Sequence, residues 1–221
     1  MRKTPFVSGE YYHIYNRGVD KRITFLDEAD VQRFYDSMEE FNTLEPIGSI
    51  YENAFAKRLG SRTSKSGVLV NFIAYCVNPN HFHFLIRQES KKGIEKFMQR
   101  IGTGYTKYFN NKNKRSGALF QGKFKSIHVN SNEYLLYVSA YVNLNDRVHQ
   151  FGSPTSKLVK SKSSWKEYIK RESGEKQFCT KDIILGQFRN VAEYKEFALS
   201  ALESILEGKT QAKELAIFLL E

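Results

Sequence analysis

Two histidines separated by one apolar residue are the feature of this sequence best suited to chemistry. His81 and His83 flank Phe82, and the apolar run that continues to Ile86 is typical of a buried β-strand. Because residues two apart in a strand point to the same side, both imidazoles share one face. Neutral imidazole is the commonest side-chain ligand of divalent metals. The pair therefore predicts half of a metal site, the alternative being a purely structural strand.

A second pair of chemically capable residues lies on a predicted helix over residues 132–145. Tyr141 and Asn145 are four positions apart and share one helix face. Tyrosine can attack phosphorus as a covalent nucleophile, and an asparagine carbonyl can supply a hard oxygen ligand to a divalent ion. A helix beside the histidine strand would bring a phenol and a third ligand to the imidazoles. The alternative is an amphipathic helix whose tyrosines, among them Tyr134 and Tyr137, only pack.

Positive charge is concentrated in the middle of the chain. The 221 residues carry a net charge of +10, and residues 91–125 hold ten Lys or Arg against a single acid. Aromatic residues are interleaved with these cations, so groups that grip phosphates lie beside rings that stack on bases. The polar loop 110–117 buries little surface, and nucleic-acid binding explains its charge best. DNA contacts are predicted for Arg17, Lys107, Lys112, Lys114, Arg115, Lys123 and Lys125.

The elements that must position these residues alternate in type. Helices are predicted over 27–42, 93–110 and 132–145, and strands over 11–17, 68–77, 81–87 and 119–129. The turn Asn78-Pro79-Asn80 joins two of the strands into a hairpin whose second arm carries the histidines. The order strand, helix, strand, strand, helix, strand predicts an α+β fold. Its centre is a ferredoxin-like βαββαβ antiparallel sheet, with helix 132–145 added as the catalytic helix.

The composition is that of an ordinary soluble globular protein. Hydrophobic residues make up 41% of the chain and charged residues 26%, and no apolar run approaches the roughly 18 residues of a membrane span. The N-terminus leads into no signal-type apolar segment, so a cytoplasmic location is expected. Cys76 and Cys179 are about 100 positions apart, so neither a disulfide framework nor a thiolate zinc site is indicated.

A change of composition follows Phe151. A polar, Ser- and Lys-rich stretch comes first, and a capping box at Asn190 then opens a helix predicted to reach about residue 207. A second short helix is predicted over 210–220. We therefore expect one domain over residues 1–151 and a helical C-terminal appendage over 152–221, which either packs on that domain or adds DNA contacts.

Four motifs in a fixed order resemble a known family. They are the His-hydrophobe-His strand, Tyr-x-x-Tyr-Phe-Asn at 105–110, Arg-Ser-Gly-x-Leu-Phe-Gln-Gly-Lys-Phe-Lys at 115–125, and Tyr-Val-Asn-Leu-Asn at 141–145. Together they are similar to the HUH single-strand DNA tyrosine transposase family, and within it to the REP-associated tyrosine transposases. Such proteins commonly have Asn-Pro where this chain has Asn145-Asp146. The loss of proline softens the helix end without removing a ligand.

The resemblance implies a metal-dependent single-strand DNA endonuclease and strand transferase, acting on hairpin or palindromic DNA. It assigns His81, His83 and Asn145 to a Mg²⁺ or Mn²⁺ site and Tyr141 to the nucleophile, which would form a 5′-phosphotyrosine. Two other classes stay open: a hydrolytic metalloenzyme that uses activated water at the histidines, and a non-catalytic ferredoxin-like nucleic-acid-binding module. The sequence does not decide between a monomer and a homodimer.

Five further ring side chains have less specific expectations. His13 and His128 lie in predicted strands and are candidates for approaching the metal or DNA, whereas His149 follows the catalytic helix and is expected to be solvated. Tyr105 and Tyr108 belong to the helix after the histidine strand. Such a helix packs across the sheet, so both are assigned to packing or base stacking rather than to nucleophilic attack.

Overall fold

A five-stranded antiparallel sheet carries the other elements of the fold. The computed structural model describes residues 5–53, 67–149, 157–170 and 177–218. The strand order is β4-β1-β3-β2-β5, and each neighbouring pair is antiparallel. The strands are β1 (Tyr11–Arg17), β2 (Val70–Asn78), β3 (His81–Gln88), β4 (Lys125–Val129) and the short β5 (Lys162–Ser163). The order β4-β1-β3-β2 is that of a ferredoxin-like sheet, so the predicted α+β fold is confirmed.

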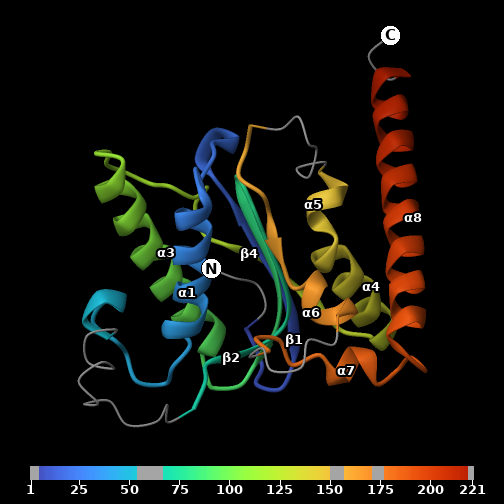
Figure 1. Cartoon of the computed structure of the whole chain (residues 1–221), viewed down its shortest axis with the longest axis horizontal. Coiled ribbons are helices and arrows are strands. Elements are labelled where there is room, and N and C mark those ends of the chain that lie inside the picture. The colour runs from blue at the N-terminus through green and yellow to red at the C-terminus, as the bar shows by residue number, and fades with distance from the viewer. Residues whose placement is uncertain (1–4, 54–66, 150–156, 171–176, 219–221) are drawn as a thin grey trace.

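Helices cover both faces of this sheet (Figure 1). One face is covered by α1 (Glu28–Glu40) and α3 (Gly93–Lys112), and a 3-10 turn (Val19–Lys21) precedes α1. The other face carries α4 (Asn132–Asn143), α5 (Asn145–Val148), α6 (Trp165–Ile169), α7 (Asp182–Leu185) and α8 (Val191–Phe218). None of the described helices is both long and apolar enough to cross a bilayer.

Strand β3 is buried on both sides, and its centre, residues 82–86, is apolar at every position except His83. Phe82 and Phe84 point into the core beneath α1 and α3, where they meet Phe34. Residues of the opposite parity point to the other face, where Leu85 joins a second core formed with α4, α6 and α8. The same alternation places His81 and His83 on that second face.

The hairpin of β2 and β3 forms as predicted. Asn78 pairs with His81 across a two-residue turn made by Pro79 and Asn80. Strand β4 is shorter than predicted, because residues 119–124 run beside the end of β1 without regular pairing. They are held there by a bridge between Gly18 and Phe120.

The predicted helix 132–145 is wrong at its end. Helix α4 begins at Ser131, whose hydroxyl accepts from the Tyr134 amide at 3.1 Å, and ends at Asn143. Leu144 leaves helical geometry, with φ −109° and ψ 16°, and α5 starts at Asn145. The chain breaks its helix here without a proline, because Leu144 is buried in the core while Asn145 turns toward the sheet.

The C-terminal elements pack on the second face of the sheet. Strand β5 pairs with β2, and Trp165, Tyr168 and Tyr194 are buried in the second core. The capping box at Asn190 forms, but the two helices predicted after it are one continuous helix, α8, so the predicted break near residue 208 is wrong. The domain boundary at residue 151 stays a prediction, because residues 150–156 are outside the described part of the chain.

Candidate functional site

The four residues predicted to carry chemistry come together on the α4 face of the sheet. The Nε2 atom of His81 lies 3.0 Å from Oδ1 of Asn145, and the ring centroids of His83 and Tyr141 are 5.4 Å apart. His81, His83 and Tyr141 line a cavity of about 260 Å³, which we call the small cavity. Its lining includes Tyr15, Arg17, Gln121, Lys125 and His149 as well as His81, His83 and Tyr141.

Strand register explains this convergence. Arg17 of β1 pairs with His81, and Tyr15 pairs with His83, so their side chains share the face of the two histidines. Asn78 of β2 is the partner of His81 on the other side. The lining of the small cavity comes from the adjacent strands β4, β1 and β3, from Tyr141 of α4 and from His149, which follows α5.

Hydrogen bonds on the hairpin turn determine which nitrogen of His81 carries its proton. The Nδ2 group of Asn80 donates to the carbonyl of Lys21 at 3.2 Å, so Oδ1 of Asn80 faces His81 Nδ1 at 2.6 Å. An amide oxygen only accepts, so Nδ1 of His81 must be the protonated nitrogen. In the neutral ring Nε2 then holds a lone pair, which accepts from Nδ2 of Asn78 at 3.0 Å and lies equally close to Oδ1 of Asn145.

Asn78 orients the amide of Asn145. Its Oδ1 accepts from the Ser161 hydroxyl at 2.7 Å, and its Nδ2 donates to Asn145 Oδ1 at 2.8 Å. Nδ2 of Asn78 also lies 3.0 Å from His81 Nε2, so its two hydrogens serve two electron-pair donors, the Asn145 oxygen and the His81 nitrogen, which are 3.0 Å apart. Neighbouring ligands of an octahedral ion with bonds of about 2.1 Å are about 3.0 Å apart, so this donor pair fits a divalent cation.

His83 has a buried partner, His13, which the sequence analysis named only as a candidate for approaching the site. Nε2 of His13 lies 2.8 Å from Nδ1 of His83, and both side chains are buried. If His83 donates through Nδ1, its Nε2 is available as a metal ligand, and His13 acts as the acceptor that holds the ring. Such outer hydrogen bonds are typical of metal-binding histidines.

Burial sets the protonation of these side chains. It lowers the pKa of His13 and of His81 to about 4 and holds the pKa of His83 well below its usual value. All three rings are therefore neutral at pH 7, as metal ligands must be. Burial also raises the pKa of Tyr141, an effect that its contact with Asn145 partly offsets. The phenol is protonated at rest and must lose its proton during an attack.

Among the described residues, no group of three or more His, Cys, Asp or Glu side chains is placed to hold a metal ion. A third protein ligand beside His81 and His83 would thus come from an amide, and Asn145 supplies one. A donor set of two imidazoles and an amide oxygen contains no thiolate, so it differs from a thiolate-type zinc site.

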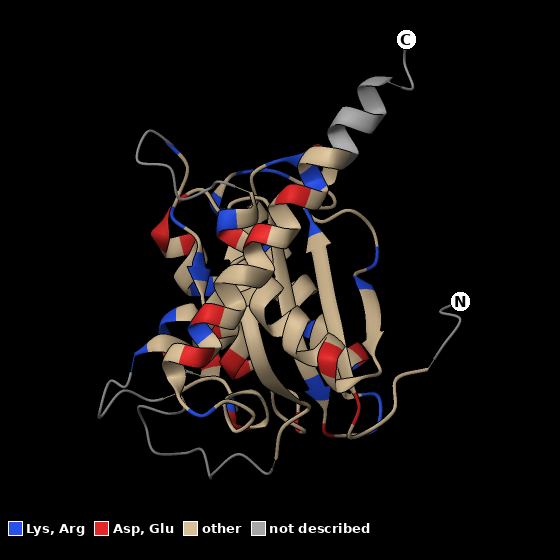
Figure 2. Ribbon diagram, turned by 90° about the vertical axis from the view of Figure 1, so that its right-hand side faces the viewer, with Lys and Arg blue, Asp and Glu red and all other residues tan. Residues whose placement is uncertain are grey.

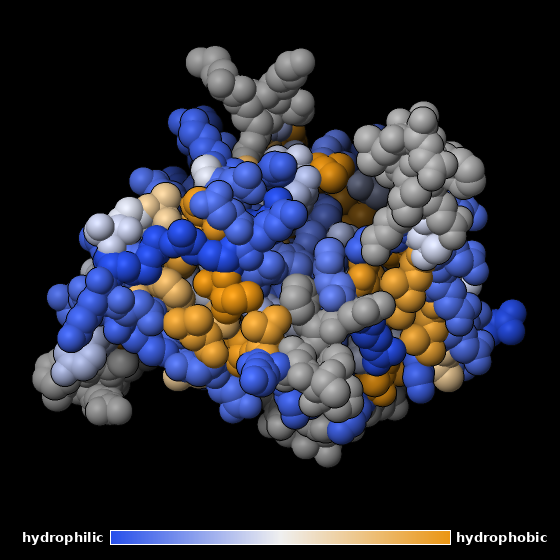
Figure 3. Space-filling model, turned by 90° about the horizontal axis from the view of Figure 1, so that it is seen from above, coloured by the Kyte–Doolittle hydropathy of each residue, from blue (hydrophilic) through white to orange (hydrophobic). Residues whose placement is uncertain are grey.

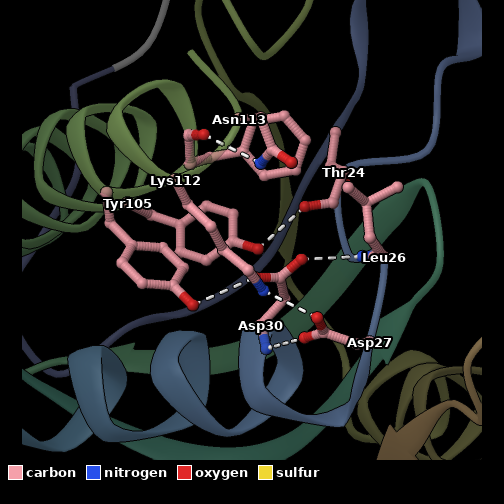
Figure 4. Close-up of polar contacts among 9 residues, drawn as sticks. Thr24, Leu26, Asp27, Asp30, Tyr105, Lys112 and Asn113 are labelled. Atoms are coloured by element: carbon pink, nitrogen blue, oxygen red, sulfur yellow. Dashed lines mark hydrogen bonds and ion pairs between the residues drawn. The ribbon is translucent and has the colours of Figure 1, made fainter. Parts of the chain in front are cut away.

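Tyr105 and Tyr108 lie on the opposite face of the sheet from the small cavity. The buried Tyr105 hydroxyl donates to the Thr24 carbonyl at 2.8 Å, and the Tyr108 hydroxyl donates to Asp30 at 3.0 Å (Figure 4). Both are thus used in packing between α1 and α3. Tyr137 is 41% exposed and does not line the small cavity.

The residues predicted to contact DNA fall into two groups. Arg17 and Lys125 line the small cavity, and Lys107 and Lys123 line a larger one on the other face. Lys and Arg lie mainly at strand ends, in loops and on helices, whereas the strands themselves are largely uncharged (Figure 2). The four cations are therefore placed around the end of β1.

The other three predicted contacts lie at the end of α3. The Lys112 ammonium lies 2.7 Å from carboxylate oxygens of both Asp27 and the fully buried Asp30 (Figure 4). Any phosphate contact of Lys112 would compete with these carboxylates. Arg115 donates to Oδ1 of Asn110 at 2.6 Å and to the Ala118 carbonyl at 3.1 Å, which holds the loop, and Lys114 adopts a positive φ of 48°.

Of the two remaining histidines, His128 lies away from the small cavity and His149 lines it. His128 is exposed and pairs with Glu10 at 3.0 Å, away from the small cavity. His149 is exposed as expected, but its ring centroid lies 4.7 Å from that of His81 and it lines the small cavity.

Asn78 and Ser161 were not named in the sequence analysis as members of the site. The sequence signal that could have located Asn78 is its place at the hairpin turn. Nothing local in the sequence marks Ser161.

Comparisons with known proteins agree with the fold. Residues 54–145 match the family model described as "Transposase IS200 like". A solved structure of a REP-associated tyrosine transposase bound to a REP hairpin is similar, with a TM-score of 0.50 and 14% sequence identity. The match covers 77% of this chain and 86% of that one and, at this identity, shows the fold alone. None of the curated proteins matches the chain.

Proposed function

Since residues 54–145 carry a transposase domain of the IS200-like family, as the motifs predicted, we propose that this chain is a metal-dependent single-strand DNA nuclease and strand transferase. The observation that carries the proposal is that His81, whose Nε2 atom lies 3.0 Å from Asn145 Oδ1, lines one cavity together with His83 and Tyr141. A non-catalytic binding module has no need of such an arrangement.

The proposed reaction transfers a phosphoryl group to Tyr141. The phenol oxygen of Tyr141 attacks the scissile phosphorus, and the bond to the 3′ oxygen breaks. The products are a 5′-phosphotyrosine and a free 3′-hydroxyl, and the phenol proton is released. A divalent ion held by His81, His83 and Asn145 would polarise a non-bridging oxygen of the phosphate. Because the phosphotyrosine keeps the bond energy, a second 3′-hydroxyl can rejoin the strand without ATP.

Arg17 and Lys125 complete the site for a polyanion. Both line the small cavity beside the histidines, so their charges lie where the phosphates next to the scissile bond would pass. The similar fold of a transposase bound to a REP hairpin supports hairpin-flanked single strands as the substrate class.

The test is covalent trapping. The protein is incubated with a pool of DNA hairpins that carry random single-stranded flanks, with Mg²⁺ or with EDTA, and the adduct is mapped by mass spectrometry. We expect a metal-dependent adduct on Tyr141 that is lost in Tyr141→Phe and kept in the matched control Tyr137→Phe. DNA binding without any adduct would show that the chain is a binding module, and an adduct on another tyrosine would overturn the assignment.

A further inference from the structure

A second cavity lies on the α3 face of the sheet, between α3 and residues 118–124. It encloses about 1010 Å³, the size of a ligand site, and we call it the large cavity. Its walls include the rings of Phe82, Phe120 and Phe124 and the side chain of Met98. None of these residues takes part in the proposed reaction.

Polar and charged groups are added to this apolar lining. Gln99 and Thr103 line the large cavity from α3, and Lys107 and Lys123 bring two positive charges to it against the single carboxylate of Glu95. Seen from above, the molecule is mainly hydrophilic, with apolar residues exposed in separate patches (Figure 3). An aromatic wall beside cations is the combination that binds single-stranded nucleic acid without base pairing.

The two cavities share a wall. Asn16 lines both, and its Nδ2 group contacts the carbonyl of Gly122 at 3.3 Å. Along the segment 120–125, Gln121 and Lys125 line the small cavity, whereas Phe120 and Phe124 line the large one. A strand that leaves the small cavity over this segment therefore reaches the large one directly.

We propose that the large cavity holds an unstacked nucleobase of the DNA strand whose scissile phosphate lies in the small cavity. This inference rests on the proposed function. The base stacks on Phe120 or Phe124, Gln99 and Thr103 offer hydrogen bonds to its edge, and Lys107 and Lys123 bind the flanking phosphates. The large cavity thereby discriminates among bases next to the cleavage point.

Photocrosslinking tests the proposal. The probe is a 20-nucleotide oligothymidine containing 5-iododeoxyuridine, whose excited base joins to aromatic side chains that it touches. After irradiation, the crosslinked peptides are identified by mass spectrometry. We expect crosslinks on the peptide that contains Phe120 and Phe124.

A variant that fills the large cavity tests whether the crosslink depends on that cavity. Gly102 of α3 lines the large cavity, and a Cβ atom added there meets no atom within 4 Å, so Gly102→Leu fills space without a backbone clash. The matched control is Gly208→Leu on α8, where an added Cβ also meets nothing within 4 Å. We expect the Phe120–Phe124 crosslink to fall about tenfold in Gly102→Leu and to stay unchanged in Gly208→Leu.

The outcomes separate this inference from the proposed function. Crosslinks confined to other peptides, or an unchanged yield in a folded Gly102→Leu protein, would overturn the base pocket. A Tyr141 adduct formed by the same sample would leave the proposed function standing in that case. Crosslinking at Phe120 or Phe124, combined with no adduct when the same protein is incubated with the hairpin pool, supports the base pocket and counts against the nuclease.

Discussion

His13 Nε2 lies 2.8 Å from His83 Nδ1, and the two rings are buried together beneath Tyr141. Burial lowers the pKa of both rings, so each is neutral at pH 7 and carries a proton on only one of its two nitrogens. One of the two facing nitrogens must therefore accept while the other donates. Only donation from His83 leaves its second nitrogen available to a metal.

The first prediction concerns His13 as a positioning residue. We expect His13→Ala to weaken Mn²⁺ binding about 10- to 100-fold, because His83 loses the acceptor that orients it. Isothermal titration calorimetry of the DNA-free protein measures this directly. His128→Ala is the matched control, since His128 lies on β4 away from the small cavity. An unchanged Mn²⁺ affinity in His13→Ala would remove His13 from the site.

The second prediction concerns the histidine pair. Changing both His81 and His83 to Ala should abolish adduct formation with Mg²⁺ or Mn²⁺, because two of three ligands are lost. DNA binding should persist, since it rests on Arg17 and the lysines. A gel assay scores the adduct, and fluorescence anisotropy scores binding. Cleavage at the rate of the unchanged protein would show that the proposed metal site is wrong.

The third prediction separates the cations by their partners. We expect Arg17, Lys123 and Lys125 to bind phosphates, so changing all three to Gln should reduce the slope of log affinity against log salt by about 2 on single strands. Lys112→Gln should leave that slope unchanged and instead lower stability by about 1–3 kcal/mol, because the buried Asp30 loses its counter-charge. Equal slopes in the triple variant and the unchanged protein would place the DNA surface elsewhere.

The fourth prediction is a pH dependence of the metal-free protein. His13 and His81 have folded pKa values of about 4 against about 6.5 when unfolded, so the unfolded chain binds more protons between these values. Stability is full above pH 6.5 and is lost as the pH falls toward 4, by about 1 kcal/mol for each histidine at pH 5.5. Urea unfolding in EDTA measures it, and His13→Gln should show a shallower dependence. A variant with the same dependence would contradict the assignment.

The fifth prediction tests the boundary at residue 151. Removing residues 152–221 takes Trp165, Tyr168 and Tyr194 from the second core and removes Ser161 from Asn78. We expect the shortened chain to aggregate or to melt well below the complete one, as size-exclusion chromatography and circular dichroism would show. A monomeric fragment of unchanged melting temperature would establish residues 1–151 as an independent domain.

Helices and strands whose apolar residues recur with a clear period could be predicted from the sequence. The contacts between these elements could not. Alternation in β3 and the apolar stripe of α1 follow from which faces are buried, and such patterns are local. The partners of His81 and His83, namely Asn78, Asn80 and His13, depend on strand register and turn geometry. Register depends on pairing between segments far apart in the chain, so the sequence alone did not assign these roles.

The two helix errors have different origins. Gly208 costs about 1 kcal/mol of helix propensity, an amount that a long helix tolerates, and α8 continues through it although residues 207–211 are exposed. At Leu144, by contrast, burial of the side chain and the Asn145–Asn78 contact end α4 although no proline is present. Tertiary packing outweighed local preference at Leu144.

The separation of the site along the chain has a consequence for synthesis on the ribosome. The hairpin that carries His81 and His83 is complete once 88 residues have been made, whereas Tyr141 and Asn145 lie some 55 residues further on, and Ser161 follows later still. A nascent or truncated chain therefore possesses the histidines without the attacking phenol. Under the proposed function such a chain cannot cut DNA, and cleavage competence arises only after translation has passed α4 and Asn145.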